Sequence, residues 1–194
     1  VCGLNREQDA QAAYEAGAIY GGLIFVESSP RAVNEEQARK VIAAAPLSYV
    51  GVFRNADIND IAAKADALSL SAVQLHGDED QAYIDALRHV LAPQVQIWKA
   101  QSVGATLPAR NLKHVDKYVL DNGQGGTGQR FDWSLLRGEV LDNVLLAGGL
   151  SPDNCVEAAK TGCAGLDFNS GVESQPGIKD ASKLASVFKT LRAY

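Results

Sequence analysis

The sequence has no methionine, only three cysteines and no long apolar run. A helix that spans a membrane needs about 18 or more consecutive apolar residues, so no membrane partner is expected. The cysteines Cys2, Cys155 and Cys163 are odd in number and far apart, which does not suit a disulfide framework. We therefore expect a reducing, cytoplasmic location.

An excess of positive charge is also missing. Lys and Arg number 18 against 23 Asp and Glu, which gives a net charge of −5, and no basic stripe is visible. This balance argues against a nucleic-acid partner. The three histidines His76, His89 and His114 lie far apart, and no Cys/His cluster has metal-ligand spacing. We expect no metal site.

The chain opens on Val1 and reaches Cys2 with almost no strand before it. Together with the lack of methionine, this start suggests a segment excised from a longer protein or a redesigned sequence. No linker, charge run or low-complexity segment divides residues 1–194, so we expect one domain.

Short apolar, β-branched runs recur at nearly even spacing along the chain. They are almost continuously apolar, as in parallel strands that are buried on both faces. The runs are Val1–Leu4, Ile19–Val26, Tyr49–Phe53, Ala72–Leu75, Gln96–Lys99, Tyr118–Leu120, Asn143–Ala147 and Gly165–Phe168.

Segments with helical periodicity alternate with these runs. The clear ones are Glu7–Ala16, Asn34–Ala45, Ile58–Leu70, Glu79–Leu91, Pro152–Lys160 (after a Ser151 cap) and Asp180–Arg192, with weaker signals at Thr106–Leu112 and Trp133–Arg137. Eight strand-then-helix units predict an α/β fold, a single (β/α)8 or TIM barrel. A doubly wound open sheet is the runner-up.

Polar residues gather at the predicted strand ends. In such barrels the active site lies at the C-terminal ends of the strands. The residues at these ends are Cys2, Arg31, Arg54, His76, Lys99, Asp121, Gly148, Gly149, Asn169, Ser170 and Gly171.

The loops after the last two strands suit a phosphate group. Backbone N–H groups of Gly148, Gly149, Ser170 and Gly171 are candidate donors, although the glycines also suit tight turns. A third glycine-rich stretch, which includes Gly126, follows Asp121 and is either a flexible cover or a further set of phosphate donors.

The reactive candidates each have a plainer explanation. Asp121 is either a general acid or base, or a loop cap, and Cys2 is either a nucleophile or base, or a small buried apolar residue. Arg31 and Arg54 suit an anionic group but also a solvated surface. His76 and Lys99 are open to substrate contact or to a structural hydrogen bond.

The motifs "VCGL", "GGLIFVESSPR", "VGVFRN", "VQLHGDE", "YVLDNGQGGTG", "LAGGL" and "DFNSGVE" together resemble the phosphoribosylanthranilate isomerase family from end to end. The resemblance implies an Amadori rearrangement of a phosphosugar in tryptophan biosynthesis, without cofactor or metal. It further implies that Cys2 is the general base, that Asp121 is the general acid, that Arg31 meets the anthranilate end, and that His76 lines the substrate. The chain is similar to the isomerase half of a bifunctional protein that also carries indole-glycerol-phosphate synthase.

This assignment requires a protonated Asp121 and a deprotonated Cys2, so we expect their surroundings to shift each pKa from its ordinary value. Asn5 stands where the family usually has threonine. The alternatives are a related aminoaldose phosphate isomerase, which uses two aspartates, and a weakened or non-catalytic phosphate-binding barrel.

Overall fold

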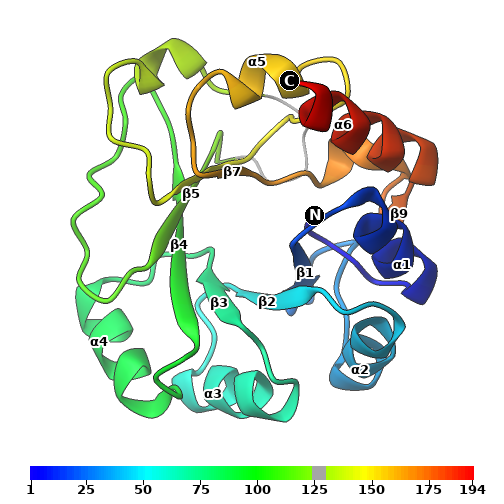
Figure 1. The fold of residues 1–194 in the computed structure, drawn as a ribbon. Helices are drawn as coiled ribbons and strands as arrows, with labels where there is room; N and C mark the ends of the chain where they lie inside the picture. Colours follow the sequence, from blue (N-terminus) through cyan, green and yellow to red (C-terminus); the bar gives the residue numbers. More distant parts are fainter. Residues whose placement is uncertain (124–129) are drawn as a thin grey trace.

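Seven parallel strands form one curled sheet in the computed structural model, which describes residues 1–123 and 130–194. Each strand pairs with the next one along the chain, so the sheet order within these residues is β1 to β7 without a crossover. The strands are β1 Tyr20–Ile24, β2 Ser48–Phe53, β3 Ala72–Leu75, β4 Gln96–Ser102, β5 Lys117–Asp121, β6 Val144–Leu146 and β7 Gly165–Leu166. The sheet curls until β7 approaches β1, with the helices outside it (Figure 1). The predicted single-domain α/β fold is confirmed.

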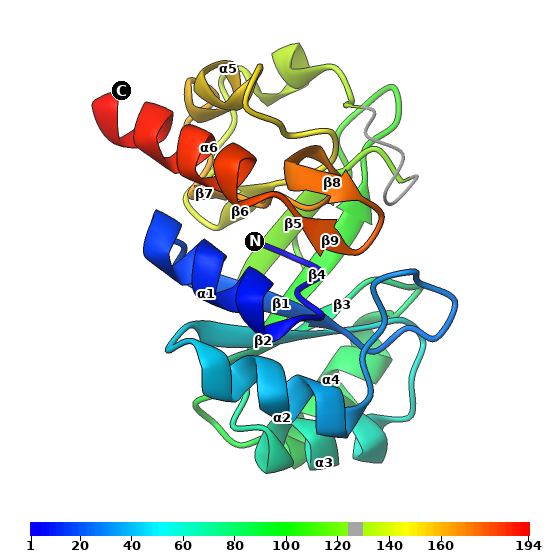
Figure 2. The same cartoon turned by 90° about the vertical axis from the view of Figure 1, so that its right-hand side faces the viewer.

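The predicted first strand, Val1–Leu4, takes the place of a strand without being a regular one. Its backbone lies between β1 and the end of β7: the Gly22 N–H donates to Val1 O at 2.8 Å, and the Cys2 N–H donates to Phe168 O at 2.9 Å. Gly3 has φ +72°, a left-handed conformation that interrupts the extended run. The segment therefore closes the barrel, and the view in Figure 2 shows it passing beside β1.

The helices pack on the outer face of the sheet. They are α1 Glu7–Ala16, α2 Glu35–Ala44, α3 Ile58–Ala67, α4 Gln81–Val90, α5 Cys155–Ala159 and α6 Ala181–Ala193, with 3-10 turns η1 Trp133–Leu136 and η2 Ser170–Val172. Side chains of Asn34, Asp57, Asp80 and Asp180 accept hydrogen bonds from backbone N–H groups in the first turns of α2, α3, α4 and α6.

Two predicted helices differ from the structure. The helix expected from Pro152 begins only at Cys155, because residues 152–154 form a turn in which the Ser151 N–H donates to the Asn154 side chain. The weak Thr106–Leu112 helix is wrong. That stretch runs as irregular chain and contains Pro108, which cannot donate a helical hydrogen bond.

A short antiparallel hairpin, β8 Glu173–Gln175 and β9 Ile178–Lys179, was not predicted. Its turn contains Gly177 at φ +81°, and it lies between β7 and α6. The hairpin brings two charged residues, Glu173 and Lys179, into the interior.

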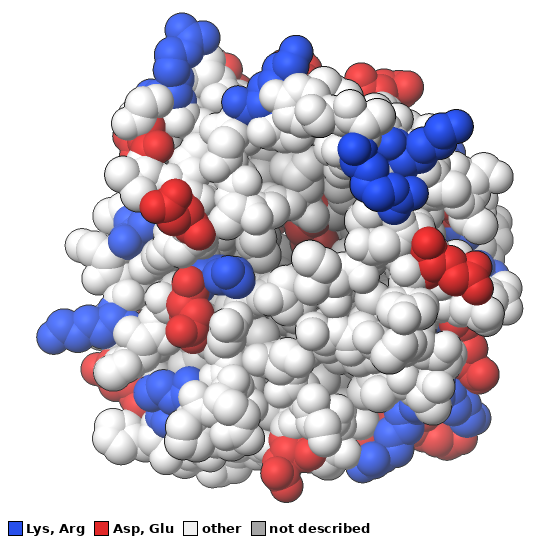
Figure 3. All heavy atoms as spheres, viewed as in Figure 1, with Lys and Arg blue, Asp and Glu red and all other residues white. Residues whose placement is uncertain are grey.

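Two apolar layers hold the barrel together. The larger layer joins the helices to the outward side chains of the strands. The second layer contains no helix residue among those described and therefore fills the concave side of the sheet; its members are Val50, Ala72, Trp98, Ala100, Val119, Leu145 and Ala147. None of the described helices is long and apolar enough to cross a membrane. On the face seen in Figure 3, basic and acidic side chains are interspersed, and the surface is hollowed near its centre.

Candidate active site

The predicted catalytic residues come from different parts of one rim. Cys2 belongs to the segment that closes the barrel, and Asp121 is the last residue of β5. His76 directly follows β3, and Arg31 lies between β1 and α2. All four therefore lie at the ends where the parallel strands stop, as expected for residues at strand tips.

Asp121 is buried and has a histidine partner. Its Oδ2 lies 3.3 Å from Nε2 of His76, and its Oδ1 accepts a hydrogen bond from the Gly123 N–H at 2.7 Å. The other ring nitrogen of His76 lies 3.2 Å from Nε2 of Gln74. This pairing is not evident from the sequence, although both side chains were expected at strand ends. The carboxyl group is thus held in one orientation at the mouth of the barrel.

Gly148 makes room for Asp121. A Cβ atom at Gly148 would lie 3.4 Å from the Asp121 Cβ and 3.3 Å from the Asn122 backbone nitrogen. The glycine also has φ +80°, so a side chain is disfavoured there for two reasons. The loop after β6 consequently packs directly against the candidate acid.

Cys2 lies in an apolar setting. It is buried against Ile24 and Val52. Burial, followed by the charge of Asp167, raises the pKa of the thiol to about 12, although the positive charge of Lys179 opposes the shift. The expectation that the surroundings favour a thiolate is wrong for this structure, because desolvation outweighs the nearby cation.

Asp167 is a charged residue near the site that was not among the predicted site residues. Phe168 packs against Phe188 of α6, with ring centroids 6.4 Å apart, so the preceding residue Asp167 faces the concave side of the sheet. It lines an interior cavity of about 440 Å³ together with Cys2 and Gln74, and this cavity extends toward the strand starts at Tyr20 and Lys117, away from the mouth. Burial raises the pKa of its carboxyl group. The motif "LDFNSGVE" contains this aspartate, and its place near a strand end was the available signal.

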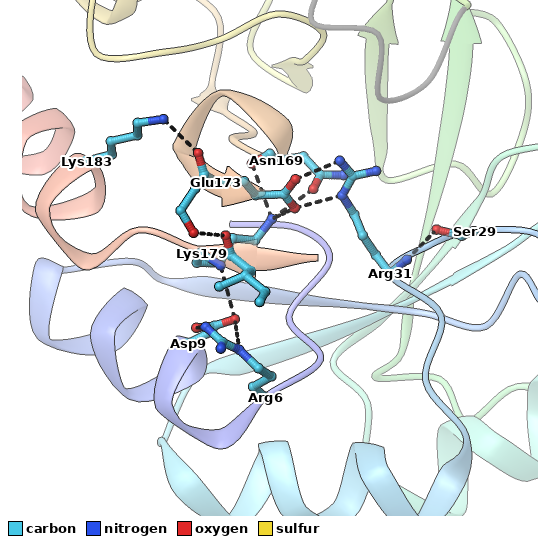
Figure 4. A network of polar contacts seen from close by, with 10 residues as sticks. Arg6, Asp9, Ser29, Arg31, Asn169, Glu173, Lys179 and Lys183 are labelled. Carbon is cyan, nitrogen blue, oxygen red and sulfur yellow. Dashed lines mark hydrogen bonds and ion pairs between the residues drawn. The ribbon is translucent and has the colours of Figure 1, made fainter. Parts of the chain in front are cut away.

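Arg31 is buried and held by Glu173. Its Nε and Nη2 each donate to one carboxylate oxygen of Glu173 at 2.7 Å (Figure 4). Burial alone would raise the pKa of Glu173, but its ion pairs with Arg31 and Lys179 lower it below the ordinary value. Within the described residues, Nη1 of Arg31 makes no hydrogen bond. Arg31 is therefore fixed in position and keeps one nitrogen for a further acceptor.

The two predicted phosphate loops lie side by side. Gly149, at φ +70°, accepts a hydrogen bond on its carbonyl from the Asn154 side chain at 2.8 Å. A Cβ atom at Gly171 would lie 1.9 Å from Leu150 O, so the loop after β7 touches the loop after β6. Ser170 and Gly171 open the turn η2. Gly126 lies outside the described residues. Phosphate binding by these loops stays a prediction.

The remaining strand-end residues have plainer surroundings. Lys99 is buried and donates to Glu79 Oε2 at 2.9 Å and to Gly77 O at 2.7 Å, which identifies it as a structural anchor of the loop after β3. Arg54 is exposed. All three cysteines are free. The described residues contain no group of three or more His, Cys, Asp or Glu side chains that could hold a metal ion.

The sequence model of the N-(5′-phosphoribosyl)anthranilate (PRA) isomerase family matches residues 1–190. Among curated proteins, the chain is 75% identical over 194 residues to the tryptophan biosynthesis protein TrpCF of Salmonella typhi and 66% identical to that of Yersinia pestis. It covers only 43% and 41% of the lengths of these two relatives.

Solved structures resemble the chain over nearly its whole length. The phosphoribosyl anthranilate isomerase from Thermus thermophilus superposes with a TM-score of 0.86 at 30% identity, covering 99% of this chain and 96% of that one. A phosphoribosyl anthranilate isomerase in complex with reduced 1-(o-carboxyphenylamino)-1-deoxyribulose 5-phosphate superposes with a TM-score of 0.82, also at 30% identity, covering 100% of this chain and 97% of the other. These neighbours share the fold.

Proposed function

Because the chain belongs to the N-(5′-phosphoribosyl)anthranilate isomerase family, we propose that it catalyses the Amadori rearrangement of N-(5-phosphoribosyl)anthranilate to 1-(2-carboxyphenylamino)-1-deoxyribulose 5-phosphate. The observation that carries the residue roles is the convergence of Asp121, paired with His76, and Cys2 on one rim. The reaction is the isomerisation step of tryptophan biosynthesis.

Asp121 is the general acid in this proposal. A proton from its carboxyl group passes to the ring oxygen of the sugar while the C1–O bond breaks, which opens the ring and leaves a protonated imine at C1. Its contacts with His76 and the Gly123 N–H hold the carboxyl group in place for this transfer. Such fixed orientation of reacting groups is a large part of catalysis.

Cys2 is the general base. Its thiolate removes the proton from C2, the C2–H electrons form a C1=C2 bond, and the resulting enolamine tautomerises to the ketone product. The cationic imine adds positive charge to the site, and this charge favours the thiolate over the thiol. Because burial raises the pKa of the Cys2 thiol, the thiol releases its proton to solvent readily only when the substrate's cationic imine is present in the site.

The substrate has two anionic ends, and separate parts of the rim suit each. Nη1 of Arg31 suits the carboxylate of the anthranilate ring, while Gly148, Gly149, Ser170 and Gly171 suit the phosphate. His76 lines the space between these ends.

The test is an assay that follows the loss of substrate fluorescence for the parent chain, Cys2→Ser and Asp121→Asn. Each variant is expected to lose activity by at least about 10²-fold, the usual loss for an acid or base. Calorimetric binding of the reduced product analogue provides the control that the site has formed. Analogue binding without turnover by the parent would favour the non-catalytic alternative, and no binding would contradict the proposal altogether.

We also propose that the chain works as the isomerase part of a longer bifunctional protein that carries indole-glycerol-phosphate synthase. The support is that the curated TrpCF relatives are more than twice as long as the region that they share with this chain. A cytoplasmic location fits a biosynthetic enzyme with three free cysteines. Fractionation of cells that produce the full-length protein would test the location.

A further inference from the structure

A buried ion-pair network joins the loop after β1 to the β8–β9 hairpin (Figure 4). Glu173 is its centre, because its carboxylate accepts hydrogen bonds from both Arg31 and Lys179. Lys179 Nζ donates to Glu173 Oε1 at 2.8 Å and to Asn169 Oδ1 at 2.9 Å, and its side chain is fully buried.

The direct partners of Lys179 Nζ are the Glu173 carboxylate, which it shares with Arg31, and Asn169. The Asp167 carboxyl group is a second acidic group within electrostatic reach of Lys179. Removing an ammonium group from water is costly unless its charge is compensated. Burial accordingly lowers the pKa of Lys179, although the Glu173 ion pair opposes the shift. A fully buried ammonium group beside the segment that carries Cys2 calls for a functional explanation.

Two residues of the network pack closely against the backbone of Gly3, next to Cys2. A Cβ atom at Gly3 would lie 2.8 Å from the Arg31 Cδ and 2.9 Å from the Asn169 Oδ1. Gly3 follows Cys2 directly, and the Cys2 N–H is bound to Phe168 O, just before Asn169. Arg31 and Asn169 therefore fix the turn that carries the thiol.

Several charged groups surround the Cys2 sulfur. Asp167, directly after β7, disfavours a negative charge on the thiol, whereas Lys179 favours one. Arg31 is a further cation within electrostatic reach. Of these charged groups, Lys179 is the one on β9, and its positive charge lowers the pKa of Cys2.

We propose that Lys179 is a positioning residue for Cys2: through Glu173 and Asn169 it holds a buried positive charge beside the thiolate that removes the C2 proton. This inference rests on the proposed function and extends it, since the relevant cation comes from β9, which lies outside the motifs. Lys179 itself does not touch the reacting atoms.

The first test measures the rate at which iodoacetamide alkylates Cys2 near pH 8, with the modified peptide identified by mass spectrometry. Only the thiolate reacts, so a rise of about one unit in the thiol pKa slows the reaction about tenfold. We expect this slowing in Lys179→Met and a rate near that of the parent in Lys179→Arg. Lys183→Met is the matched control, because the hydrogen bond of the Lys183 ammonium group within the described residues goes to the backbone carbonyl of Glu173, at 2.7 Å.

A second variant covers the case in which Lys179→Met fails to fold. Lys179→Gln keeps a hydrogen-bond donor for Glu173 and removes only the charge, so slow alkylation is expected again. A purely structural role would leave the alkylation rate near that of the parent in Lys179→Gln. Equal rates in the parent and in the folded variants would overturn the proposal.

Steady-state kinetics then connect the charge with the reaction. In Lys179→Met, kcat/KM near neutral pH is expected to fall about tenfold and to recover as the pH rises, with KM within about twofold of the parent. A loss that does not recover with pH would overturn the role of Lys179. A parent chain that shows no isomerisation would instead overturn the proposed function, and the alkylation experiment keeps the two outcomes distinct.

Discussion

Asp121 and His76 show how much of a site can be read from single residues. Both were identified as strand-end residues from the sequence, because apolar runs stop at polar side chains there. Their contact at 3.3 Å was not predicted, because it joins the ends of β3 and β5 across the mouth of the barrel. Side-chain pairing across a barrel depends on rotamers and on the curl of the sheet, which residue type and spacing do not specify.

The contact between His76 and Asp121 predicts a kinetic effect. His76→Asn removes the ring nitrogen that lies beside Oδ2 of Asp121, so the carboxyl group loses its fixed orientation. We expect kcat to fall by about 10- to 100-fold, the scale of a misplaced catalytic group, with weaker effects on binding of the reduced product analogue. His89→Asn is the control, because His89 is exposed on α4. An unchanged kcat in His76→Asn would show that the contact does not orient the acid.

Cys2 predicts a loss of stability at alkaline pH. Its pKa is raised from 9.0 to about 12 in the folded state, so the unfolded chain releases the proton first as the pH rises. The stabilisation is complete below about pH 9 and is lost between about pH 9 and 12, at about 1.4 kcal/mol per unit. Tyr49 and Tyr83, with pKa values raised to about 12, act in the same direction.

Urea denaturation at about pH 8 and pH 10.5 measures this effect. The free energy of unfolding of the parent is expected to fall by about 2 kcal/mol more over this interval than that of Cys2→Ser, since serine does not titrate there. Equal losses in the two proteins would mean that the buried thiol is not the group that titrates.

At the scale of elements, local sequence signals set most boundaries. Asn34, Asp57, Asp80 and Asp180 cap helices because a short polar side chain can accept from a free N–H group of the first turn. The signals failed where tertiary contacts decide. The β8–β9 hairpin is too short to produce an alternating pattern, and the Arg31–Glu173 pair joins residues 142 positions apart. The ion-pair network of Arg31, Glu173 and Lys179 could therefore not be predicted from the sequence.

The loop between β3 and α4 gives an element-scale prediction. Lys99 and Glu79 form a buried pair, and Glu79 also accepts N–H donors from Asn55 and Gly77. Lys99→Met leaves a buried carboxylate without its cation, and we expect the free energy of unfolding near pH 7 to fall by about 3 kcal/mol.

The pH dependence identifies the cause of this loss. Burial alone would raise the pKa of Glu79, but the hydrogen bond from Lys99 and the backbone donors lower it below its ordinary value of 4.5. The pair therefore stabilises the fold above about pH 4.5, and its contribution disappears as the pH falls through the lowered pKa. Denaturation curves of the parent and Lys99→Met should converge toward pH 3; a gap that is constant with pH would point to lost packing instead.

The whole molecule depends on closure of the sheet by a segment that is not a regular strand. Eight recurring strand-and-helix units predicted the barrel, and the order of the strands followed from the alternation alone. The way in which the ring closes did not follow, since it depends on Gly3 and on backbone contacts from Val1–Leu4 to both β1 and the end of β7. Closure and catalysis are thus linked, because the same segment carries Cys2.

Gly22 tests this link. A Cβ atom there would lie 2.8 Å from the Cys2 Sγ and 3.0 Å from the Cys2 Cα, so Gly22→Ala forces the closing segment away from β1. Overpacking of this kind costs about 1–3 kcal/mol, and a displaced thiol should also lower kcat by about 10²-fold. Thermal melts, the fluorescence assay and analogue binding measure the three consequences. Gly104→Ala is the matched control, because no atom of the described part of the chain lies within 4 Å of its Cβ position. If Gly22→Ala melts and turns over like Gly104→Ala, the segment has room to move, and the close packing of Cys2 on β1 is not what holds the base in place.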